Sequence, residues 1–127
     1  MSEQTGAPSR RLVVKSTAGA SSPELTNQAF TVAASALAAG VEVSVWLTGD
    51  SAWFGVPGRA GDLVLEHAAP LDDLLAALVD GGTVTVCTQC AARRGITPED
   101  LLPGVRIAGA PVFVEEIMAP QTQALVY

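Results

Sequence analysis

The sequence predicts an α/β domain built on a doubly wound parallel sheet of about five strands. Short runs rich in β-branched residues alternate with helical segments along the chain, which is the pattern of strand–helix–strand units. Prolines stand where helices should begin, and glycines stand where they should end. Hydrophobic residues make up 49% of the chain and aromatic residues only 5%. Small apolar side chains must therefore fill the interior, which suits helices packed closely on a sheet.

The first strand–helix–strand unit follows a polar start. A strand is expected over 12–16 and a second over 41–47. Between them, Ser22 has the residue type of a helix cap, and the helix should run over 23–39 with Gly40 as its stop. The apolar residues of this helix recur every three or four positions and define its buried face: Leu25, Ala29, Val32, Ala33, Ala36 and Leu37.

The middle of the chain is harder to interpret. Residues 48–51 are typical of a turn, and 52–61 follow no regular pattern because two glycines and a proline interrupt them. The apolar residues 63–65 are compatible with a short edge strand. A second helix is expected over 71–80, with two acidic residues near its positive end.

The last third predicts two further strand–helix units and a final strand. A β-branched run over 83–86 reads as a buried strand. Residues 97–100 have the cap, proline and acids of a brief helix start. A strand over 105–108, a helix over 111–118 and a last strand over 124–127 complete the pattern.

Two cysteines mark the predicted functional site. Cys87 directly follows the strand 83–86, and Cys90 follows in C-x-x-C spacing, before a short helix that Gly95 should close. Open α/β sheets bind ligands and react at the carboxyl ends of their strands. Free N–H groups and the dipole at a helix start favour the thiolate, which is the reactive form of cysteine. We expect Cys87 to be the reacting thiol and Cys90 to be either a resolving thiol or a packing residue.

Two charged residues are weaker candidates for the same site. Arg94 could stabilise a thiolate or a sulfur anion, or it could be a solvated cation at a helix end. Asp50 follows the second strand and should reach the same sheet edge as Cys87, but an acid in a turn more often bonds to nearby backbone. Trp53 and Phe54 are expected to pack in the core, with a lid or a subunit contact as the alternative.

Composition limits the remaining possibilities. The formal net charge is −6, and no basic cluster is large enough for nucleic acid as the main ligand. No apolar run reaches the length of a membrane span, and the polar N-terminus does not resemble a signal peptide. We expect a cytoplasmic protein, in which two cysteines are more often catalytic, redox-active or metal-binding than a structural disulfide. Residues 1–10 should be a disordered lead, and 11–127 a single domain.

The C-terminal half resembles the DsrE/DsrF-like family of small sulfur-relay proteins. The resemblance is carried by residues 83–109: Val86-Cys87 and Cys90, then Arg94-Gly95-Ile96-Thr97, then Gly104-Val105. The final Leu125-Val126-Tyr127 also matches the family pattern, and Asp50 matches it more weakly. The likeness in layout extends over most of 11–127.

The resemblance implies a flavodoxin-like sheet, a trimer or hexamer, and a cysteine that accepts sulfur as a persulfide. Within the family pattern the persulfide position corresponds to Cys87, whereas a thiol at the position of Cys90 is present in some relatives and absent from others. The implied partners are proteins that donate or accept sulfur, and no cofactor is expected. Known relays combine two or three related subunits, which one sequence does not reveal.

The C-x-x-C spacing has two other interpretations, and the sequence favours neither of them. Zinc would need further ligands, and His67 is the only histidine to offer besides carboxylates. A thioredoxin-like site would stand earlier in the chain and would be preceded by tryptophan. Three functional hypotheses therefore remain: a sulfur carrier or sulfurtransferase that uses Cys87, a thiol–disulfide protein that uses Cys87 and Cys90, and a non-catalytic binding module of the same fold.

Overall fold

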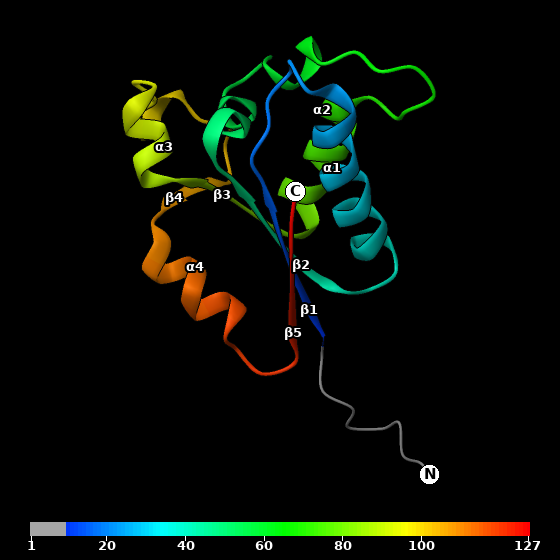
Figure 1. Ribbon diagram of the computed structural model, residues 1–127, viewed down its shortest axis with the longest axis vertical. Coiled ribbons are helices and arrows are strands. Elements are labelled where there is room, and N and C mark those ends of the chain that lie inside the picture. The colour runs from blue at the N-terminus through cyan, green and yellow to red at the C-terminus, as the bar shows by residue number, and fades with distance from the viewer. Residues whose placement is uncertain (1–9) are drawn as a thin grey trace.

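The computed structural model describes residues 10–127, so the predicted disordered lead lies outside the described residues except for Arg10. Within this range, five strands alternate with four α-helices and three short 3₁₀ helices (Figure 1). The strands are β1 (Arg11–Ser16), β2 (Glu42–Leu47), β3 (Thr83–Cys87), β4 (Val105–Ala108) and β5 (Thr122–Val126). The helices are α1 (Pro23–Ala38), η1 (Gly49–Gly55), η2 (Ala60–Asp62), α2 (Leu71–Gly81), α3 (Thr88–Arg93), η3 (Pro98–Asp100) and α4 (Ala110–Ile117).

The strands form one sheet in the order β4-β3-β2-β1-β5, and every neighbouring pair is parallel. The chain steps in one direction across the sheet from β1 to β4 and then crosses back to the far edge for β5. Because crossovers between parallel strands are right-handed, steps in opposite directions place their helices on opposite faces. The predicted doubly wound parallel sheet of about five strands is confirmed.

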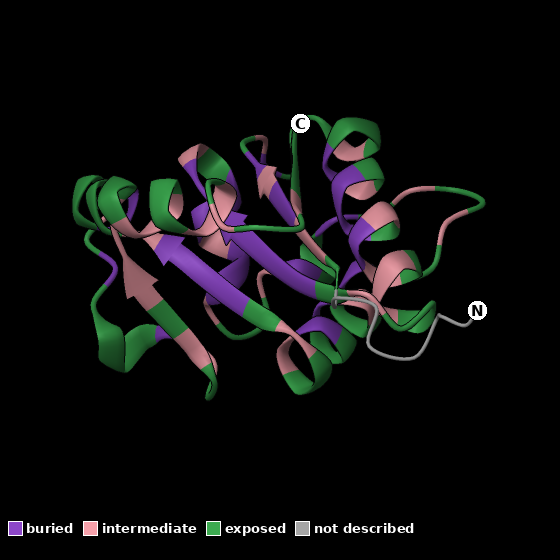
Figure 2. Cartoon of the chain, turned by 90° about the horizontal axis from the view of Figure 1, so that it is seen from below, coloured by how far each residue is buried: buried purple, intermediate pink, exposed green. Residues whose placement is uncertain are grey.

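Two layers of unequal size cover the sheet. α1, α2 and η1 lie on one face, where they share a hydrophobic core with the inner strands. α4 lies on the opposite face, where Phe113 packs edge-on against Trp46 of β2 with ring centroids 5.3 Å apart. The inner strands are largely buried, whereas the edge strands β4 and β5 contain no buried residue (Figure 2).

α1 begins at Pro23 as predicted and ends one residue before the predicted position, and its end uses the predicted glycine. Gly40 has φ +88°. Its N–H donates to Leu37 O, and the N–H of Val41 donates to Ala36 O, both at 3.0 Å. These two hydrogen bonds close the helix, and they require a residue at position 40 that tolerates positive φ. Ser22 occupies the N-cap position as predicted but makes no side-chain capping bond.

The buried face of α1 is rotated relative to the prediction. Ala29 and Ala33 are buried as expected, but Leu25 is exposed. Thr26 and Phe30 are buried instead. The Phe30 ring packs edge-on against Phe54 of η1, with centroids 5.9 Å apart. A large ring is needed to fill the space beside η1, and the helical pattern alone did not reveal that η1 lies there.

The segment between β2 and α2 differs most from the prediction. Residues 49–55, predicted as a turn and an unpatterned stretch, form η1. The short edge strand predicted for 63–65 is wrong, since these residues pair with no strand. The two edge positions of the sheet belong to β4 and β5. Leu63 is buried in the core, while Val64 points to solvent.

α4 contains no buried residue. Polar contacts with the sheet therefore contribute much of what holds this helix in place. Oε1 of Glu116 accepts hydrogen bonds from the Ser44 hydroxyl at 2.6 Å and from the Trp46 indole N–H at 3.0 Å. Oε2 of Glu116 pairs with Arg106, whose Nε also donates to the Thr85 hydroxyl at 2.5 Å. Burial raises the pKa of Glu116, but these donors and the charge of Arg106 outweigh burial and lower it.

We expect Glu116→Gln to lower the free energy of unfolding by about 1–3 kcal/mol at neutral pH, because it removes the charge from a hydrogen-bonded ion pair. The lowered pKa means that the ionised carboxylate contributes stability fully above the ordinary value of 4.5. That contribution is lost as the pH falls through the lower pKa of the folded state. Urea unfolding at several pH values should therefore show the two proteins converging in acid.

Glu115→Gln is the matched control, because Glu115 is an exposed neighbour on the same helix. It should unfold within about 0.5 kcal/mol of the wild type at every pH. A Glu116→Gln protein that is as stable as the wild type at neutral pH would contradict the stabilising role of the contacts under α4.

Candidate functional site

Cys87 lies where two neighbouring connections leave the sheet on opposite faces. It is the last residue of β3 and is paired with Ala108 at the end of β4. After β3 the chain enters α3, which packs against η1, and after β4 it enters α4 on the opposite face. In open α/β sheets, the crevice at such a switch point is where ligands bind. The structure thus places Cys87 at the predicted edge of the sheet.

Hydrogen-bond donors surround the half-buried thiol of Cys87. Burial raises its pKa, but the backbone N–H and the thiol of Cys90, together with the backbone N–H of Gln89, donate to the sulfur. The ammonium group of Lys15 adds a favourable charge, and the combined effect lowers the pKa of Cys87 below its ordinary value of 9.0. The N–H donors belong to the first turn of α3, because Cys87 is the N-cap residue of that helix. A lowered pKa increases the thiolate fraction at neutral pH.

Cys90 connects the Cys87 thiol to the turn after β2. Its side chain is only 8% exposed. Its sulfur accepts the backbone N–H of Gly49 at 3.1 Å, and its thiol donates to Cys87. Gly49 has φ +52°, and a Cβ at this position would lie 2.7 Å from the carbonyl oxygen of Thr17. Only glycine permits this approach, so the N–H donor to Cys90 depends on the residue type at position 49.

The other two predicted site residues contact each other rather than the Cys87 thiol. Nη2 of Arg94 lies 2.8 Å from Oδ1 of Asp50, and Nε of Arg94 lies 3.3 Å from the same oxygen. Nη1 of Arg94 donates to the Cys90 carbonyl oxygen at 3.1 Å. The pair therefore ties the start of η1 to the end of α3, and the carboxylate neutralises the arginine charge. The structure brings Asp50, Cys90 and Arg94 together, and among them Cys90 is the residue whose hydrogen bonding lowers the pKa of Cys87.

Lys15 of β1 is the cation that acts on Cys87, and sequence reasoning missed it. It is the only lysine in the chain, and it follows the apolar run Leu12-Val13-Val14 of β1. A charged residue inside an interior strand is uncommon, and this signal was present in the sequence. The sequence did not show that Lys15 lies on the same face as Cys87, because this relation arises from the register of the paired strands. Lys15 is paired with Trp46, and Trp46 is paired with Thr85, two residues before Cys87.

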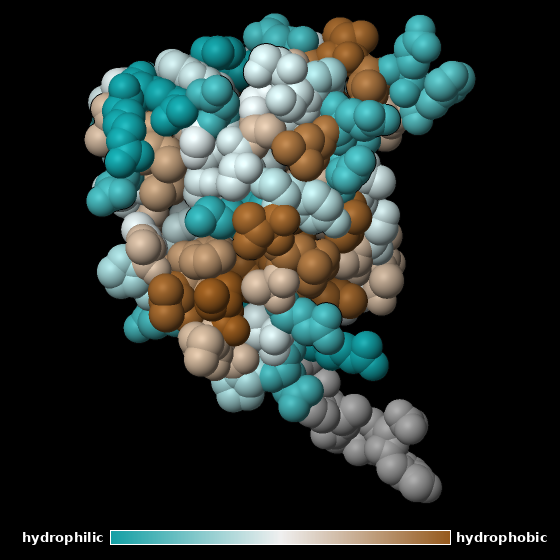
Figure 3. Space-filling view, in the orientation of Figure 1, coloured by the Kyte–Doolittle hydropathy of each residue, from teal (hydrophilic) through white to brown (hydrophobic). Residues whose placement is uncertain are grey.

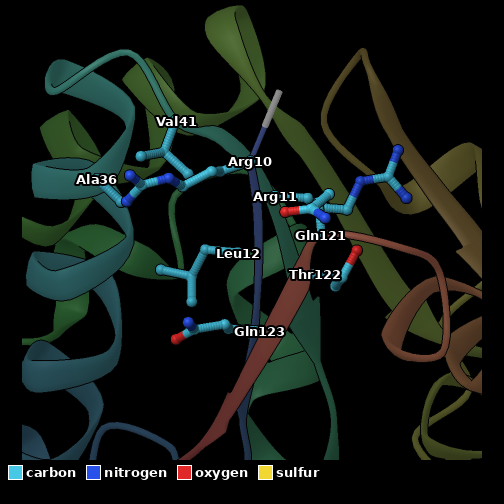
Figure 4. A pocket seen from close by; sticks show the side chains of 8 residues that line it. All are labelled: Arg10, Arg11, Leu12, Ala36, Val41, Gln121, Thr122 and Gln123. Carbon is cyan, nitrogen blue, oxygen red and sulfur yellow. The ribbon is translucent and has the colours of Figure 1, made fainter. Parts of the chain in front are cut away.

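The larger hollows lie away from the thiol. One of about 400 Å³ lies at the amino edge of the sheet, between α1 and the first residues of β1 and β5 (Figure 4). Another, of about 620 Å³, lies between α2 and the segment before β4. A smaller one of about 230 Å³ adjoins Asp50, between η1 and the loop after β1. Chemistry at Cys87 would therefore take place at the open edge of the sheet.

The remaining candidates lie outside the thiol site. Phe54 is buried in the core as expected, and Arg59 stacks on Trp53 with its guanidinium carbon 4.3 Å from the ring centroid. His67 is exposed in the loop before α2. Over residues 10–127 there is no group of three or more His, Cys, Asp or Glu side chains placed to hold a metal ion. No helix in the described part of the chain has the length and apolar character needed to cross a membrane.

Comparison with known proteins matches this chain to the DsrE/DsrF-like family over residues 11–119. The uncharacterized protein MJ0760 of Methanocaldococcus jannaschii is 31% identical over 114 residues, which cover 88% of this chain and 41% of that protein. The uncharacterized protein MK0008 of Methanopyrus kandleri is 32% identical over 80 residues, covering 63% of this chain and 64% of that protein. The chain therefore spans less than two thirds of the length of either relative.

Two solved structures share the fold. The YchN protein of E. coli superposes with a TM-score of 0.76 at 19% identity, covering 94% of this chain and 100% of that chain. MTH1491, a protein of unknown function from Methanobacterium thermoautotrophicum, superposes with a TM-score of 0.64 at 15% identity, covering 93% and 99%. At these identities the likeness concerns the fold alone.

We expect the alkylation rate of Cys87 by iodoacetamide to rise with a midpoint below pH 9.0, the ordinary value for a thiol. Cys90→Ala should move this midpoint to higher pH, because it removes a thiol donor that stabilises the thiolate. Cys90→Ser should move it less, because the hydroxyl group can still donate. Peptide mass spectrometry on samples quenched at each pH gives the rate at Cys87.

The Cys90 variants also provide the control, since Ala and Ser at this position remove the same sulfur atom and differ in the hydroxyl group. A wild-type midpoint at or above 9.0, or the same midpoint in the wild type and Cys90→Ala, would contradict the described role of the donors.

Proposed function

Because the chain belongs to the DsrE/DsrF-like family, we propose that it is a sulfur carrier that accepts sulfane sulfur as a persulfide on Cys87. The observation that carries the proposal is the Cys87 thiol itself. Its pKa is lowered by donors from α3 and Cys90, and it stands at the open carboxyl edge of the sheet. A thiolate at such an edge can meet both a sulfur donor and a second protein that receives the sulfur.

The proposed loading step is a displacement at sulfur. The Cys87 thiolate attacks the outer sulfur of a donor persulfide, R–S–SH, and forms a new S–S bond. The old S–S bond breaks, and its electron pair leaves with the donor as R–S⁻. Delivery is the same step in reverse roles: an acceptor thiolate attacks the terminal sulfur of Cys87–S–SH and restores the Cys87 thiolate. No external oxidant or reductant is needed in either direction.

Cys90 supports a second candidate function, that of a thiol–disulfide protein. Hydrogen bonding from its thiol helps to lower the pKa of Cys87, and both cysteines are free. Attack of Cys90 on the inner sulfur of Cys87–S–SH would give the Cys87–Cys90 disulfide and release H₂S. Cys90 would then limit the lifetime of the persulfide.

We expect the wild-type protein to gain the mass of about one sulfur atom after incubation with inorganic polysulfide, and to lose it with dithiothreitol. Cys87→Ser should gain none, because the accepting thiolate is absent. Cys90→Ser should gain the sulfur and keep it longer if Cys90 resolves the persulfide. Intact-mass spectrometry over time measures all three proteins.

Each outcome distinguishes the candidates. Equal mass gain in wild type and Cys87→Ser would show that Cys87 is not the acceptor. No mass gain in any variant would favour a non-catalytic binding module. An unchanged persulfide lifetime in Cys90→Ser, with no internal disulfide in peptide maps, would leave Cys90 as a packing residue.

An apolar surface formed by α4 and β5 supports a further proposal, that the chain assembles as a trimer or hexamer. Figure 3 shows hydrophobic side chains gathered on this side of the molecule. Val114 of α4 is 51% exposed, Met118 directly after α4 is 76% exposed, and Val126 on the edge strand β5 is 65% exposed. An edge strand and an apolar helix face that adjoin each other are surfaces that proteins usually cover. Cys87 lies on the α4 side of the sheet, so a neighbouring subunit would border the thiol site.

We expect light scattering at micromolar concentration to report a trimer or hexamer, and Val114→Glu with Met118→Glu to shift the protein to monomer. Both side chains are already exposed in the monomer, so the charges should disturb association rather than folding. Val64→Glu is the matched control, because Val64 is 82% exposed in the loop before α2, away from this surface. A wild-type protein whose measured mass stays at 13.0 kDa at all micromolar concentrations would refute the assembly.

A further inference from the structure

Lys15 and Cys87 share the face of the sheet on which α4 lies. Lys15, Trp46 and Thr85 form one row across β1, β2 and β3. Trp46 contacts α4, and Thr85 accepts a hydrogen bond from Arg106, the partner of Glu116 on α4. Because side chains alternate along a strand, Cys87 projects to the same face as Thr85.

An aromatic ring, not a carboxylate, holds the Lys15 ammonium group in place. Its Nζ lies 5.1 Å from the centroid of Phe113, and Phe113 is packed edge-on against Trp46. The face of an aromatic ring attracts a cation without cancelling its charge. The ammonium group is therefore positioned and still carries a full positive charge.

Two arginines on elements that adjoin Cys87 are neutralised. Arg94, at the end of α3, is paired with Asp50 of η1, and Arg106 of β4 is paired with Glu116 of α4. Within residues 10–127, no carboxylate oxygen lies within 4.0 Å of the Lys15 ammonium. Lys15 is also the cation whose charge acts on the Cys87 thiol. Lys15 is therefore a cation on the Cys87 face of the sheet whose charge no carboxylate of the described residues cancels.

We propose that Lys15 is a positioning residue that draws anionic sulfur donors to Cys87 and balances the negative charge of the persulfide formed there. This proposal rests on the proposed function and specifies its substrate class: small sulfane donors that carry negative charge, such as inorganic polysulfide or thiosulfate. Phe113 of α4 fixes the ammonium group in position.

The reaction gives such a cation a defined task. With thiosulfate, the Cys87 thiolate attacks the outer sulfur, the S–S bond breaks, and its electron pair leaves with sulfite. One thiolate and one dianion become one persulfide anion and one sulfite dianion, so the total charge of −3 is conserved. Two anions must meet in this step, and a fixed cation lowers their repulsion. Lys15 forms no bond and transfers no proton.

Paired alkylating reagents isolate this effect. Iodoacetate is an anion and iodoacetamide is neutral, and both react with the same thiolate. Both rates are proportional to the same thiolate fraction, so this fraction drops out of their ratio at one pH. The ratio therefore reports the local electrostatic potential that an approaching anion meets. The ratio is measured at Cys87 by fragmentation mass spectrometry, at low ionic strength, because salt screens exposed charges.

Lys15→Met should lower the iodoacetate-to-iodoacetamide ratio by about threefold to tenfold, as expected for losing one nearby charge at an effective dielectric constant typical of protein surfaces. It should also move the pH midpoint of alkylation upward, because the thiolate loses a favourable charge. Lys15→Arg should restore both. Arg93→Met is the matched control: it removes one positive charge from an exposed position on α3 and should change the ratio by less than about twofold.

A Lys15→Met ratio within about twofold of the wild type, or equal effects of Lys15→Met and Arg93→Met, would overturn the proposal. Phe113→Leu tests the role of the ring and keeps the charge, and it should lower the ratio less than Lys15→Met does. Thermal unfolding of each variant confirms that the folded protein is compared.

The alkylation ratio does not depend on sulfur transfer. If wild-type protein gains sulfur from polysulfide but Lys15→Met leaves the alkylation ratio unchanged, only the role of Lys15 is refuted. If the ratio depends on Lys15 but no variant gains sulfur, the sulfur-carrier function is refuted and the cation remains a property of the thiol site.

Discussion

The parallel pairing of β1, β2 and β3 is the constraint on which the thiol edge depends, that is, the carboxyl edge of the sheet with Cys87 and Cys90. It aligns the ends of three strands that are distant in sequence, so that the turn after β2 meets the first turn of α3. The N–H of Gly49 then reaches Cys90, and Cys90 reaches Cys87. A shift of one residue in register would turn Cys87 and Lys15 to opposite faces. The chemistry of the site is therefore a consequence of strand register.

α4 shows how a helix can be fixed without being buried. Glu116 gathers donors from β2 and β4, and Phe113 packs on Trp46. These contacts occupy the inner side of the helix with few apolar groups. Val114 of α4 and Met118 directly after the helix remain exposed, as do Leu125 and Val126 of β5. The same arrangement makes α4 a firm platform and leaves an apolar surface next to the thiol edge.

Arg94 and Lys15 are held by partners of different kinds. Arg94 is matched by Asp50 and serves to tie α3 to η1. Lys15 rests on the ring of Phe113, which orients the ammonium group and leaves its charge available. A neutralised cation stabilises structure, whereas a cation held by an aromatic ring still exerts a field on an ion nearby. α4 supplies that ring, so the helix that carries the apolar surface also contributes to the environment of Cys87.

The sequence by itself determined the five strands of the sheet, the glycines that end α1 and α3, and the position of the thiols. Local signals suffice for these features: β-branched runs, Gly40 and Gly95 at helix ends, and Cys87 directly after a strand. Only the tertiary structure decided which face of α1 is buried, because η1 lies on that face, and which cation acts on the thiol. Lys15 and Cys87 are separated by two complete strand–helix units and meet through the register of three strands. Contacts of this kind depend on side chains that approach each other across the sheet, and no pattern along the chain records them.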